Sequence, residues 1–277
     1  MEWLSAFAER SNEGWLGLLA LFGLVVGSFL NVVIFRLPIM LARRWRNEAA
    51  MPAFEDREMF NLWRPLSCCP HCARPIAIKD NVPVLSWLWL RGRSRCCRQP
   101  ISRQYPLIES LTMLAFLGAG ALWPPGAALW GGLILWSFLL ALAAIDINTR
   151  LLPDCLTLPL LWLGLLFNLS AAFAPLEDAV IGAVAGYLSL WLLYWLFRLL
   201  SGKEALGYGD FKLLAALGGW LGWRALPELV LIAALSGLIV TLLWRTMRRE
   251  GRREGVARPL AFGPWLALGA LALMSLR

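Results

Sequence analysis

Two aspartates stand at the ends of apolar segments, where a negative charge is costly. Asp146 closes the run LWSFLLALAAID, and Asp210 precedes the run FKLLAALGG. A charged residue at the centre of a membrane helix costs about 2.5 to 3.5 kcal/mol on insertion scales, so such a residue calls for a reason. If the two helices pack together, the carboxylates can share one proton, with one acting as base toward water and the other as acid toward an amide. We therefore predict acid–base chemistry at Asp146 and Asp210.

The immediate surroundings of both aspartates favour a functional interpretation. Asp146 lies at the C-terminal end of its predicted helix, where the helix dipole disfavours an anion. Asp210 follows Gly207, Tyr208 and Gly209. Glycines on both sides of Tyr208 permit a positive φ and allow another backbone to approach closely, as a peptide substrate requires. We therefore predict a substrate-binding role for Gly207 and Gly209.

Two other carboxylates have simpler explanations. Asp154 follows Pro153 at the start of the run CLTLPLLWLGLL, so we expect its side chain to accept hydrogen bonds from the free amides of that helix. Glu109 lies near the start of PLIESLTML, and we expect it to meet the positive end of a helix dipole. Neither position requires a catalytic role.

The composition indicates the elements that position these residues. Hydrophobic residues make up 59% of the 277-residue chain, and charged residues only 16%, against roughly 25% in soluble domains. A membrane helix needs about 20 apolar residues to cross a hydrocarbon core about 30 Å thick. We predict an all-α integral membrane protein with about eight transmembrane helices, at 15–35, 106–124, 127–146, 155–175, 178–198, 210–223, 226–244 and 260–276.

The helix that begins at Asp210 is short and glycine-rich, so we expect it to be tilted or partly re-entrant and lined by protein. The residues before the first apolar segment include Glu2, Glu9 and Glu13 against the single Arg10, which does not fit the basic start of a cleaved signal peptide.

The charge distribution predicts the orientation in the membrane. Most of the 26 Lys and Arg residues fall in connections on one side of the eight-helix arrangement. Because basic loops stay in the cytoplasm, that side is predicted to be cytoplasmic, with both termini outside. The net charge of +8 is thus a topology signal, and we expect contact with membrane lipid and no binding of nucleic acid.

Three regions follow from the composition: residues 1–36 as an N-terminal segment with the first helix, 37–105 as a small cytoplasmic insert, and 106–277 as the polytopic membrane core. The insert holds five of the six cysteines and the only histidine, His71. It is too short for a large core of its own, so we expect a metal, a disulfide or docking onto the helices to hold it together.

The chain resembles the prepilin peptidases, also called type IV leader peptidases, which are membrane aspartic proteases of the Gly-x-Gly-Asp class. Seven blocks carry the resemblance and occur in the family's order along nearly the whole chain. They are GSFLNVVIFRLPIML at 27–41, CPHC at 69–72, DNVPVLSWLWLRGR at 80–93, PISRQYPLIE at 100–109, AAIDINTRLLPD at 143–154, GYGD at 207–210 and FGP at 262–264.

The resemblance implies a bifunctional enzyme of the bacterial inner membrane. It implies cleavage of the basic leader from type IV prepilins or type II secretion pseudopilins at the cytoplasmic face. It also implies methylation of the new N-terminal amine with S-adenosylmethionine. By position, the catalytic aspartates are Asp146 and Asp210, and Asp154 belongs to the first motif without being the usual partner. The methyl-transfer region is predicted between Cys69 and Glu109, with Gly92 and Glu109 as candidate residues.

The resemblance also implies a zinc site, because the family insert usually has two CxxC pairs, a spacing suited to tetrahedral thiolate coordination. Cys69 and Cys72 form the first pair here. In the second pair Cys97 is present, but Ser94 stands where the other thiol is expected. We predict a structural zinc site at Cys69, Cys72, Cys97 and Cys96, with Cys68 and His71 as other possible donors in place of Cys96. The alternative is a set of reduced cysteines without metal. Peptide cleavage by a carboxylate pair needs no metal ion.

Two other functions fit parts of the sequence. An intramembrane Gly-x-Gly-Asp protease resembling presenilin would have its first aspartate in a YD motif, whereas this chain has AAIDIN and a cysteine-rich insert. An ion-coupled transporter could use paired aspartates near the bilayer midplane. The position of both aspartates at helix ends and the large insert argue against a transporter.

Overall fold

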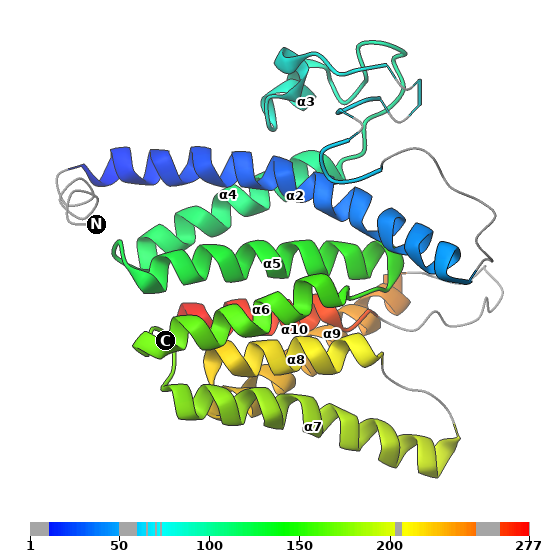
Figure 1. The fold of residues 1–277 in the computed structure, drawn as a ribbon. Coiled ribbons are helices and arrows are strands. Elements are labelled where there is room, and N and C mark those ends of the chain that lie inside the picture. The colour runs from blue at the N-terminus through cyan, green and yellow to red at the C-terminus, as the bar shows by residue number, and fades with distance from the viewer. Residues whose placement is uncertain are drawn as a thin grey trace. The chain divides into compact units, whose positions relative to one another are not determined.

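A computed structural model describes residues 11–49, 60–64, 66–69, 71–72, 74–202, 207–247 and 261–276. Within these residues the chain is mainly helical, and the β-structure consists of isolated bridges. A helix occupies each of the eight predicted apolar segments (Figure 1). These helices are α2 (Asn12–Ala49), α4 (Gln104–Leu122), α5 (Ala127–Thr149), α6 (Asp154–Phe167), α7 (Leu176–Ser201), α8 (Tyr208–Leu221), α9 (Leu226–Met247) and α10 (Gly263–Leu276). The all-α membrane fold class is confirmed.

Five helices in the described part of the chain are long and apolar enough to cross a membrane, namely α2, α4, α5, α7 and α9 with η3 (Trp223–Ala225). The helices α6 and α10 are apolar but shorter. The helix α8 has only 14 residues. The number of eight transmembrane helices therefore stays a prediction.

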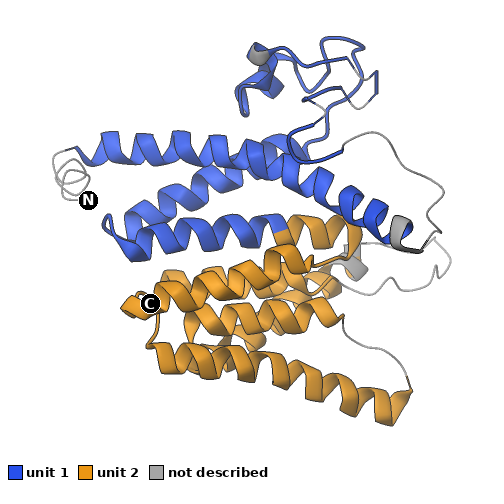
Figure 2. Ribbon diagram, in the orientation of Figure 1, with its two compact units in different colours: residues 1–141 blue, residues 142–277 orange. Residues whose placement is uncertain are grey.

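The chain forms two compact units, residues 1–141 and residues 142–277 (Figure 2). Their boundary falls inside α5, so the last turns of that helix belong to the second unit. The three regions predicted from the sequence, 1–36, 37–105 and 106–277, were defined by composition and function and not by compactness. They stay a prediction.

In the first unit, α2 and α4 pack closely because α2 has glycines at the contact. A Cβ at Gly23 would lie 2.8 Å from Cα of Met113, and one at Gly27 would lie 2.8 Å from Cα of Glu109. Such separations are too short for a side chain, so the glycines permit direct backbone contact. The helix α2 continues well past the apolar segment that ends at Phe35. At 1.5 Å per residue its 38 residues extend about 57 Å, nearly twice the thickness of a hydrocarbon core.

The insert is built from short elements between α2 and α4. These are η1 (Ile78–Asn81), α3 (Leu85–Trp89) and two isolated bridges, Cys68 with Pro75 and Arg93 with Pro100. The Arg95 guanidinium forms a bidentate hydrogen-bonded ion pair with the carboxylate of Asp80, at 2.8 to 3.1 Å. This contact lowers the pKa of Asp80 below its usual value, so the ion pair persists at neutral pH.

In the second unit, α8 lies between α6 and α7 (Figure 1) and nearly all of its residues from Asp210 to Leu221 are buried. Small residues bring α7 close to it. A Cβ at Gly186 would lie 2.7 Å from the carbonyl oxygen of Leu214, and one at Gly182 would meet the carbonyl oxygen of Gly218. This enclosure agrees with the expectation that the helix after Asp210 is lined by protein.

The far end of α8 is fixed by hydrogen bonds from buried polar groups. The Trp220 indole N–H donates to the carbonyl of Leu160 at 2.8 Å. The Asn168 amide donates to the carbonyls of Gly219 and Trp220, and its oxygen accepts from two backbone N–H groups. The α8 helix is thus held along its side by packing and at its end by these contacts, and it presents Asp210 in its first turn.

Candidate active site

Asp146 lies in the last turn of α5, where a backbone donor from α10 holds its carboxylate. The Gly263 N–H donates to Asp146 Oδ2 at 2.9 Å, and Asp146 is only 5% exposed. The first N–H groups of a helix have no partner inside the helix, so the carboxylate satisfies one of the free donors of α10. The α5 helix ends just beyond, at Thr149, and the next residue, Arg150, has a left-handed φ of 57°.

Asp210 lies in the first turn of α8, and a backbone N–H holds its carboxylate as well. The Gly207 N–H donates to Asp210 Oδ2 at 3.3 Å, while the Asp210 N–H donates to the Gly207 carbonyl at 3.1 Å. Asp210 is 8% exposed. Both aspartates are therefore buried, and each carboxylate accepts a hydrogen bond from a backbone N–H at the beginning of a helix. That helix is α10 for Asp146 and α8 for Asp210.

The second unit brings the two aspartates together, and we call Asp146 and Asp210 the aspartate pair. Their carboxylates lie close enough to interact electrostatically. Leu152, in the connection between α5 and α6, packs against Gly209, which precedes Asp210, and against Gly263, which donates to Asp146. A Cβ at Gly209 would lie 2.7 Å from Leu152 Cβ, and one at Gly263 would lie 3.2 Å from Leu152 Cδ2.

Neither Gly207 nor Gly209 uses the positive φ that glycine permits. Gly207 caps α8 in an extended conformation with a φ of −82°, and Gly209 is part of the helix and does not have a positive φ. The requirement for glycine at residue 209 has another cause, because a side chain there would collide with Leu152. A Cβ at Gly207 would make only an ordinary contact, 3.4 Å from Asp210 Oδ2. Their predicted role in substrate binding stays a prediction.

The expectation that the Asp154 side chain caps α6 is also wrong. The residue at the cap position is Pro153, and no side chain caps this end. Asp154 is the first residue of the helix, and its carboxylate accepts hydrogen bonds from the Lys212 ammonium at 2.7 Å. The Asp154 carboxylate thus binds the ammonium of Lys212 instead of the free amides of α6. This ion pair joins the beginnings of α6 and α8.

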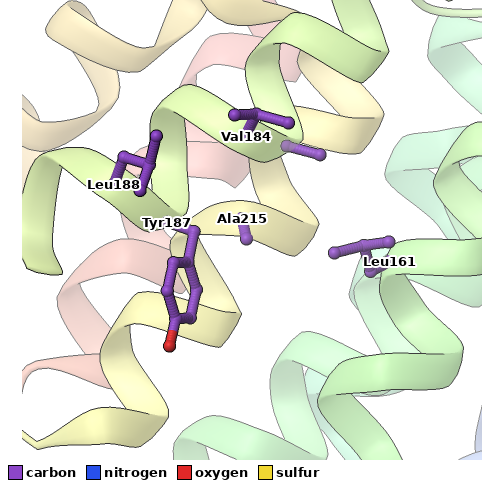
Figure 3. Close-up of a pocket in the computed structure, with 6 residues that line it drawn as sticks. Leu161, Val184, Tyr187, Leu188 and Ala215 are labelled. Atoms are coloured by element: carbon purple, nitrogen blue, oxygen red, sulfur yellow. The ribbon is translucent and has the colours of Figure 1, made fainter.

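An apolar pocket of about 370 Å³ lies elsewhere in the second unit, between α6, α7 and α8 (Figure 3). It is lined by Leu161, Ala183, Val184, Tyr187, Leu188 and Ala215. Neither aspartate lines it, and its surface offers only the Tyr187 side chain as a polar residue. The pocket is therefore separate from the candidate chemistry.

The structure gathers four cysteines of the insert, Cys69, Cys72, Cys96 and Cys97, which we call the cysteine cluster. Their sulfur atoms all lie within 4.8 Å of one another. Cys69 and Cys97 approach to 3.6 Å, and Cys72 and Cys96 to 3.2 Å. Tetrahedral zinc with Zn–S bonds of about 2.3 Å places its sulfur atoms about 3.8 Å apart, so this donor set fits a zinc ion.

Cys96 is thus the fourth sulfur of the cluster, while Cys68 and His71 are exposed and lie outside it. Ser94 is not a ligand in this arrangement. Its hydroxyl lies 3.1 Å from the Cys97 sulfur, and its backbone N–H donates to the Gln99 carbonyl. The serine supports the turn that presents Cys96 and Cys97 together.

The thiols of the cluster differ in acidity. Hydrogen bonds from the backbone at His71 and Cys72 lower the pKa of Cys69 to about 6. The neighbouring Cys72 and Cys69 sulfur atoms, with burial, raise the pKa of Cys96 to about 12. A cation placed among the four sulfur atoms would remove the repulsion that opposes ionisation of Cys96.

Gly92 and Glu109, the two candidate residues for methyl transfer, both make contacts within the protein. Gly92 has a φ of 69°, and a Cβ there would lie 2.9 Å from the Trp87 ring. Glu109 lies beyond the first turn of α4 and is buried, so the helix-dipole explanation for this residue is wrong. Its Oε2 accepts a 2.7 Å hydrogen bond from the N–H of Val84, a non-glycine residue with a φ of 59°. Glu109 thereby ties an unusual turn of the insert to α4.

Sequence reasoning did not assign Gly263 and Leu152 to the site. Gly263 is 117 positions from Asp146 in the chain. The signal that could have found it is the FGP block, in which a glycine and a proline precede an apolar helix. Leu152 lies in the block AAIDINTRLLPD, but its residue type gave no signal of a role, since a leucine beside a membrane segment is unremarkable.

Comparison with known proteins adds independent evidence. Residues 21–123 match the model of the bacterial peptidase A24 N-terminal domain, and residues 133–242 match that of the type IV leader peptidase family. A protein named prepilin leader peptidase/N-methyltransferase from Pectobacterium carotovorum subsp. carotovorum is 65% identical over 273 residues, covering 98% of this chain and 96% of the relative.

Proteins of the same name from two other bacteria are also similar. The protein from Dickeya chrysanthemi is 59% identical over 276 residues, covering 98% of this chain and 96% of the relative. The protein from Klebsiella pneumoniae is 59% identical over 231 residues, covering 83% of this chain and 96% of the relative. No solved structure matches the chain. The resemblance drawn from the sequence is confirmed, and the chain belongs to the type IV leader peptidase family.

Proposed function

We propose that this chain is an aspartic endopeptidase that removes the leader peptide of type IV prepilins or type II secretion pseudopilins, and that Asp146 and Asp210 are its catalytic pair. The observation that carries the proposal is that two buried carboxylates from α5 and α8, each held by a backbone N–H, lie close enough to interact electrostatically. The names of the relatives support the substrate class.

The aspartate pair has the chemistry that amide hydrolysis requires. One carboxylate takes a proton from a water molecule, whose oxygen attacks the scissile carbonyl carbon. The other carboxyl group supplies a proton to the departing nitrogen, and the C–N bond breaks. The backbone donors fix both carboxylates, which reduces the reorganisation needed before reaction. This route forms no covalent intermediate with the protein.

The enzyme is proposed to lie in the bacterial inner membrane with the insert and the aspartate pair facing the cytoplasm. The five long apolar helices support the membrane location, and the concentration of Lys and Arg in the predicted cytoplasmic connections supports the orientation. Substrates with a basic leader on the cytoplasmic side would meet the pair from that side. The partners are therefore prepilins or pseudopilins and the surrounding lipid.

We also propose that the cysteine cluster holds a structural zinc ion. Four sulfur donors at mutual distances that fit tetrahedral coordination support it. Bound zinc would crosslink the turn at Cys69 and Cys72 with the turn at Cys96 and Cys97, and so stabilise an insert whose described residues include few buried apolar side chains.

The second proposed activity is methylation of the new N-terminal amine, with S-adenosylmethionine as methyl donor. It rests on the name shared by the relatives, prepilin leader peptidase/N-methyltransferase. When bound, the donor supplies an electrophilic methyl group to the amine nitrogen. The contacts of Gly92 with Trp87 and of Glu109 with Val84 explain both residues without a methyl donor, so their role in methyl transfer stays a prediction.

The catalytic assignment is tested with three matched substitutions of aspartate by asparagine in the full-length protein. We expect Asp146→Asn and Asp210→Asn each to lower the rate of prepilin cleavage by at least about 100-fold, because each removes one acid–base partner. Asp154→Asn is the control, since Asp154 pairs with Lys212 on the surface, and it should retain cleavage. The measurement is the conversion of prepilin to mature pilin on a gel at equal amounts of membrane-inserted enzyme. Wild-type cleavage by either of the first two variants would contradict the assignment.

A further inference from the structure

Gly263 makes two separate contacts with the aspartate pair, and the first uses its backbone. It is the first residue of α10, and its N–H donates to Asp146 Oδ2 at 2.9 Å in a buried setting. The next backbone donors at this end, Trp265 and Leu266, bond to the Phe262 carbonyl. The helix start therefore assigns the Gly263 N–H to the carboxylate of Asp146.

The second contact depends on the missing side chain. A Cβ at residue 263 would lie 2.7 Å from Asp146 Oδ2 and 3.3 Å from Asp146 Cγ. Carbon atoms do not pack that closely against an oxygen, so any larger residue must displace the carboxylate or α10.

Leu152 links Gly263 to the beginning of α8. The Leu152 side chain lies 3.2 Å from the position of a Cβ on Gly263, and it is itself packed against Gly209, next to Asp210. Gly263, Leu152 and Gly209 thus form a continuous contact from one aspartate to the other. A shift at residue 263 would change the position of Asp146 relative to Asp210.

We propose that Gly263 is a positioning residue for leader cleavage, whose N–H and absent side chain together set the place of the Asp146 carboxylate within the aspartate pair. The inference rests on the proposed catalytic role of that pair. If it is correct, the start of α10 is part of the active site, although this helix supplies no acid or base to the proposed reaction.

The first test is Gly263→Ala in the purified full-length protein, with prepilin as substrate. The variant keeps the N–H and adds the colliding Cβ. Because small misplacements of a reacting group can cost about 100-fold in rate, we expect kcat to fall by about that factor. KM should change little, because residue 263 is not proposed to bind the prepilin. An unchanged kcat in a folded variant would overturn the proposal.

Gly269→Ala is the matched control on the same helix. A Cβ there would lie 3.0 Å from the Leu229 carbonyl oxygen, so it strains the packing of α9 against α10 without touching either aspartate. We expect its kcat to remain at the wild-type level. An equal loss of kcat in both variants would show that disturbed packing of α10 is the cause, which would also overturn the proposal.

A Cβ at residue 263 would collide with Asp146 and press against Leu152, and the double variant Gly263→Ala with Leu152→Ala separates these two effects. Removing the leucine side chain relieves the contact with Leu152 and leaves the closer contact with Asp146 Oδ2. We expect the double variant to remain impaired. Full recovery of kcat would mean that only the packing of Leu152 matters.

A backbone ester at residue 263 tests the donor without adding any bulk. Replacing glycine by glycolic acid through nonsense suppression exchanges the N–H for an oxygen atom. Loss of one preorganised donor to a charged group should lower kcat by about tenfold or more. This variant also keeps the proposal open to refutation if Gly263→Ala does not fold, because an unchanged kcat in the ester would overturn it.

Asp146→Asn is measured in the same assay to separate this inference from the proposed function. If that variant still cleaves prepilin, the catalytic pair itself is wrong. If it is inactive while Gly263→Ala cleaves normally, the pair stands and only the positioning role fails.

Discussion

Asp146 and Asp210 each receive a hydrogen bond from a backbone N–H at the beginning of a helix. An ionised carboxylate in an apolar setting is costly unless it is hydrogen-bonded, and these donors offset part of that cost. Asp154 shows the contrast, because it is exposed and neutralised by Lys212. At the residue scale, therefore, burial with backbone anchoring separates the aspartate pair from a carboxylate in a surface ion pair.

The cysteine cluster can be tested at the same scale. We expect Cys96→Ser to reduce bound zinc from about one ion per chain to a small fraction of that, because serine is a poor zinc ligand and three thiolates remain. Zinc is measured by mass spectrometry of the metal in purified full-length protein. Cys68→Ser is the control, since Cys68 is exposed and outside the cluster, and it should keep its zinc.

Ser94 allows the ligand assignment to be tested by rescue. Its hydroxyl lies 3.1 Å from the Cys97 sulfur, so a thiol at residue 94 would reach the cluster. We expect Cys96→Ser combined with Ser94→Cys to regain zinc. Full zinc in Cys96→Ser alone, or its loss in Cys68→Ser, would refute the predicted ligand set.

At the scale of elements, the position of Asp210 depends on how α8 is held. Nearly every residue of α8 after Asp210 is buried, and Gly186 of α7 brings the two helices into backbone contact. Without a hydrophobic driving force between helices in lipid, close packing of small residues is a main source of helix association. The α7 contact is therefore expected to stabilise the element that carries one of the two aspartates.

Gly186→Ala tests this contact. The added Cβ would lie 2.7 Å from the Leu214 carbonyl oxygen, and overpacking of this kind typically costs about 1 to 3 kcal/mol. We expect the midpoint of thermal unfolding, followed by tryptophan fluorescence in detergent, to fall by several degrees. Gly17→Ala, at an exposed position of α2 where a Cβ would meet nothing within 4 Å, should leave the midpoint unchanged or slightly higher. Equal midpoints for Gly186→Ala and the wild type would argue against tight α7–α8 packing.

The sequence was informative about elements wherever apolar runs begin and end. It placed a helix in all eight segments, because composition and length suffice for a membrane helix. It underestimated α2, since the helix continues through Arg36 and Pro38 after hydrophobicity ends. It also missed the contact of Gly263 with Asp146, because a hydrogen bond across 117 positions leaves no local periodic pattern. The errors at Asp154 and Glu109 have a similar origin: tertiary partners replaced the local interactions that were expected.

At the scale of the whole molecule, the number of membrane crossings decides on which side the C-terminus lies. The basic connections predict that the chain starts outside and crosses eight times, so its end would also lie outside. The element that decides this number is α8, whose 14 residues extend only about 21 Å. A helix of that length crosses a core of about 30 Å only if its flanking residues or local thinning of the bilayer make up the difference.

Reporter fusions at two positions isolate this helix. Alkaline phosphatase is active only outside the cytoplasm, and green fluorescent protein fused in parallel reports the inside. A fusion after Gly202, at the end of α7, follows five predicted crossings and should report the cytoplasm. A fusion after Arg277 follows three more and should report the outside. If both fusions report the cytoplasm, the segment between them crosses an even number of times, and α8 enters and leaves on one side. That result would replace eight crossings by seven, while Asp210 at the cytoplasmic start of α8 would keep its predicted place.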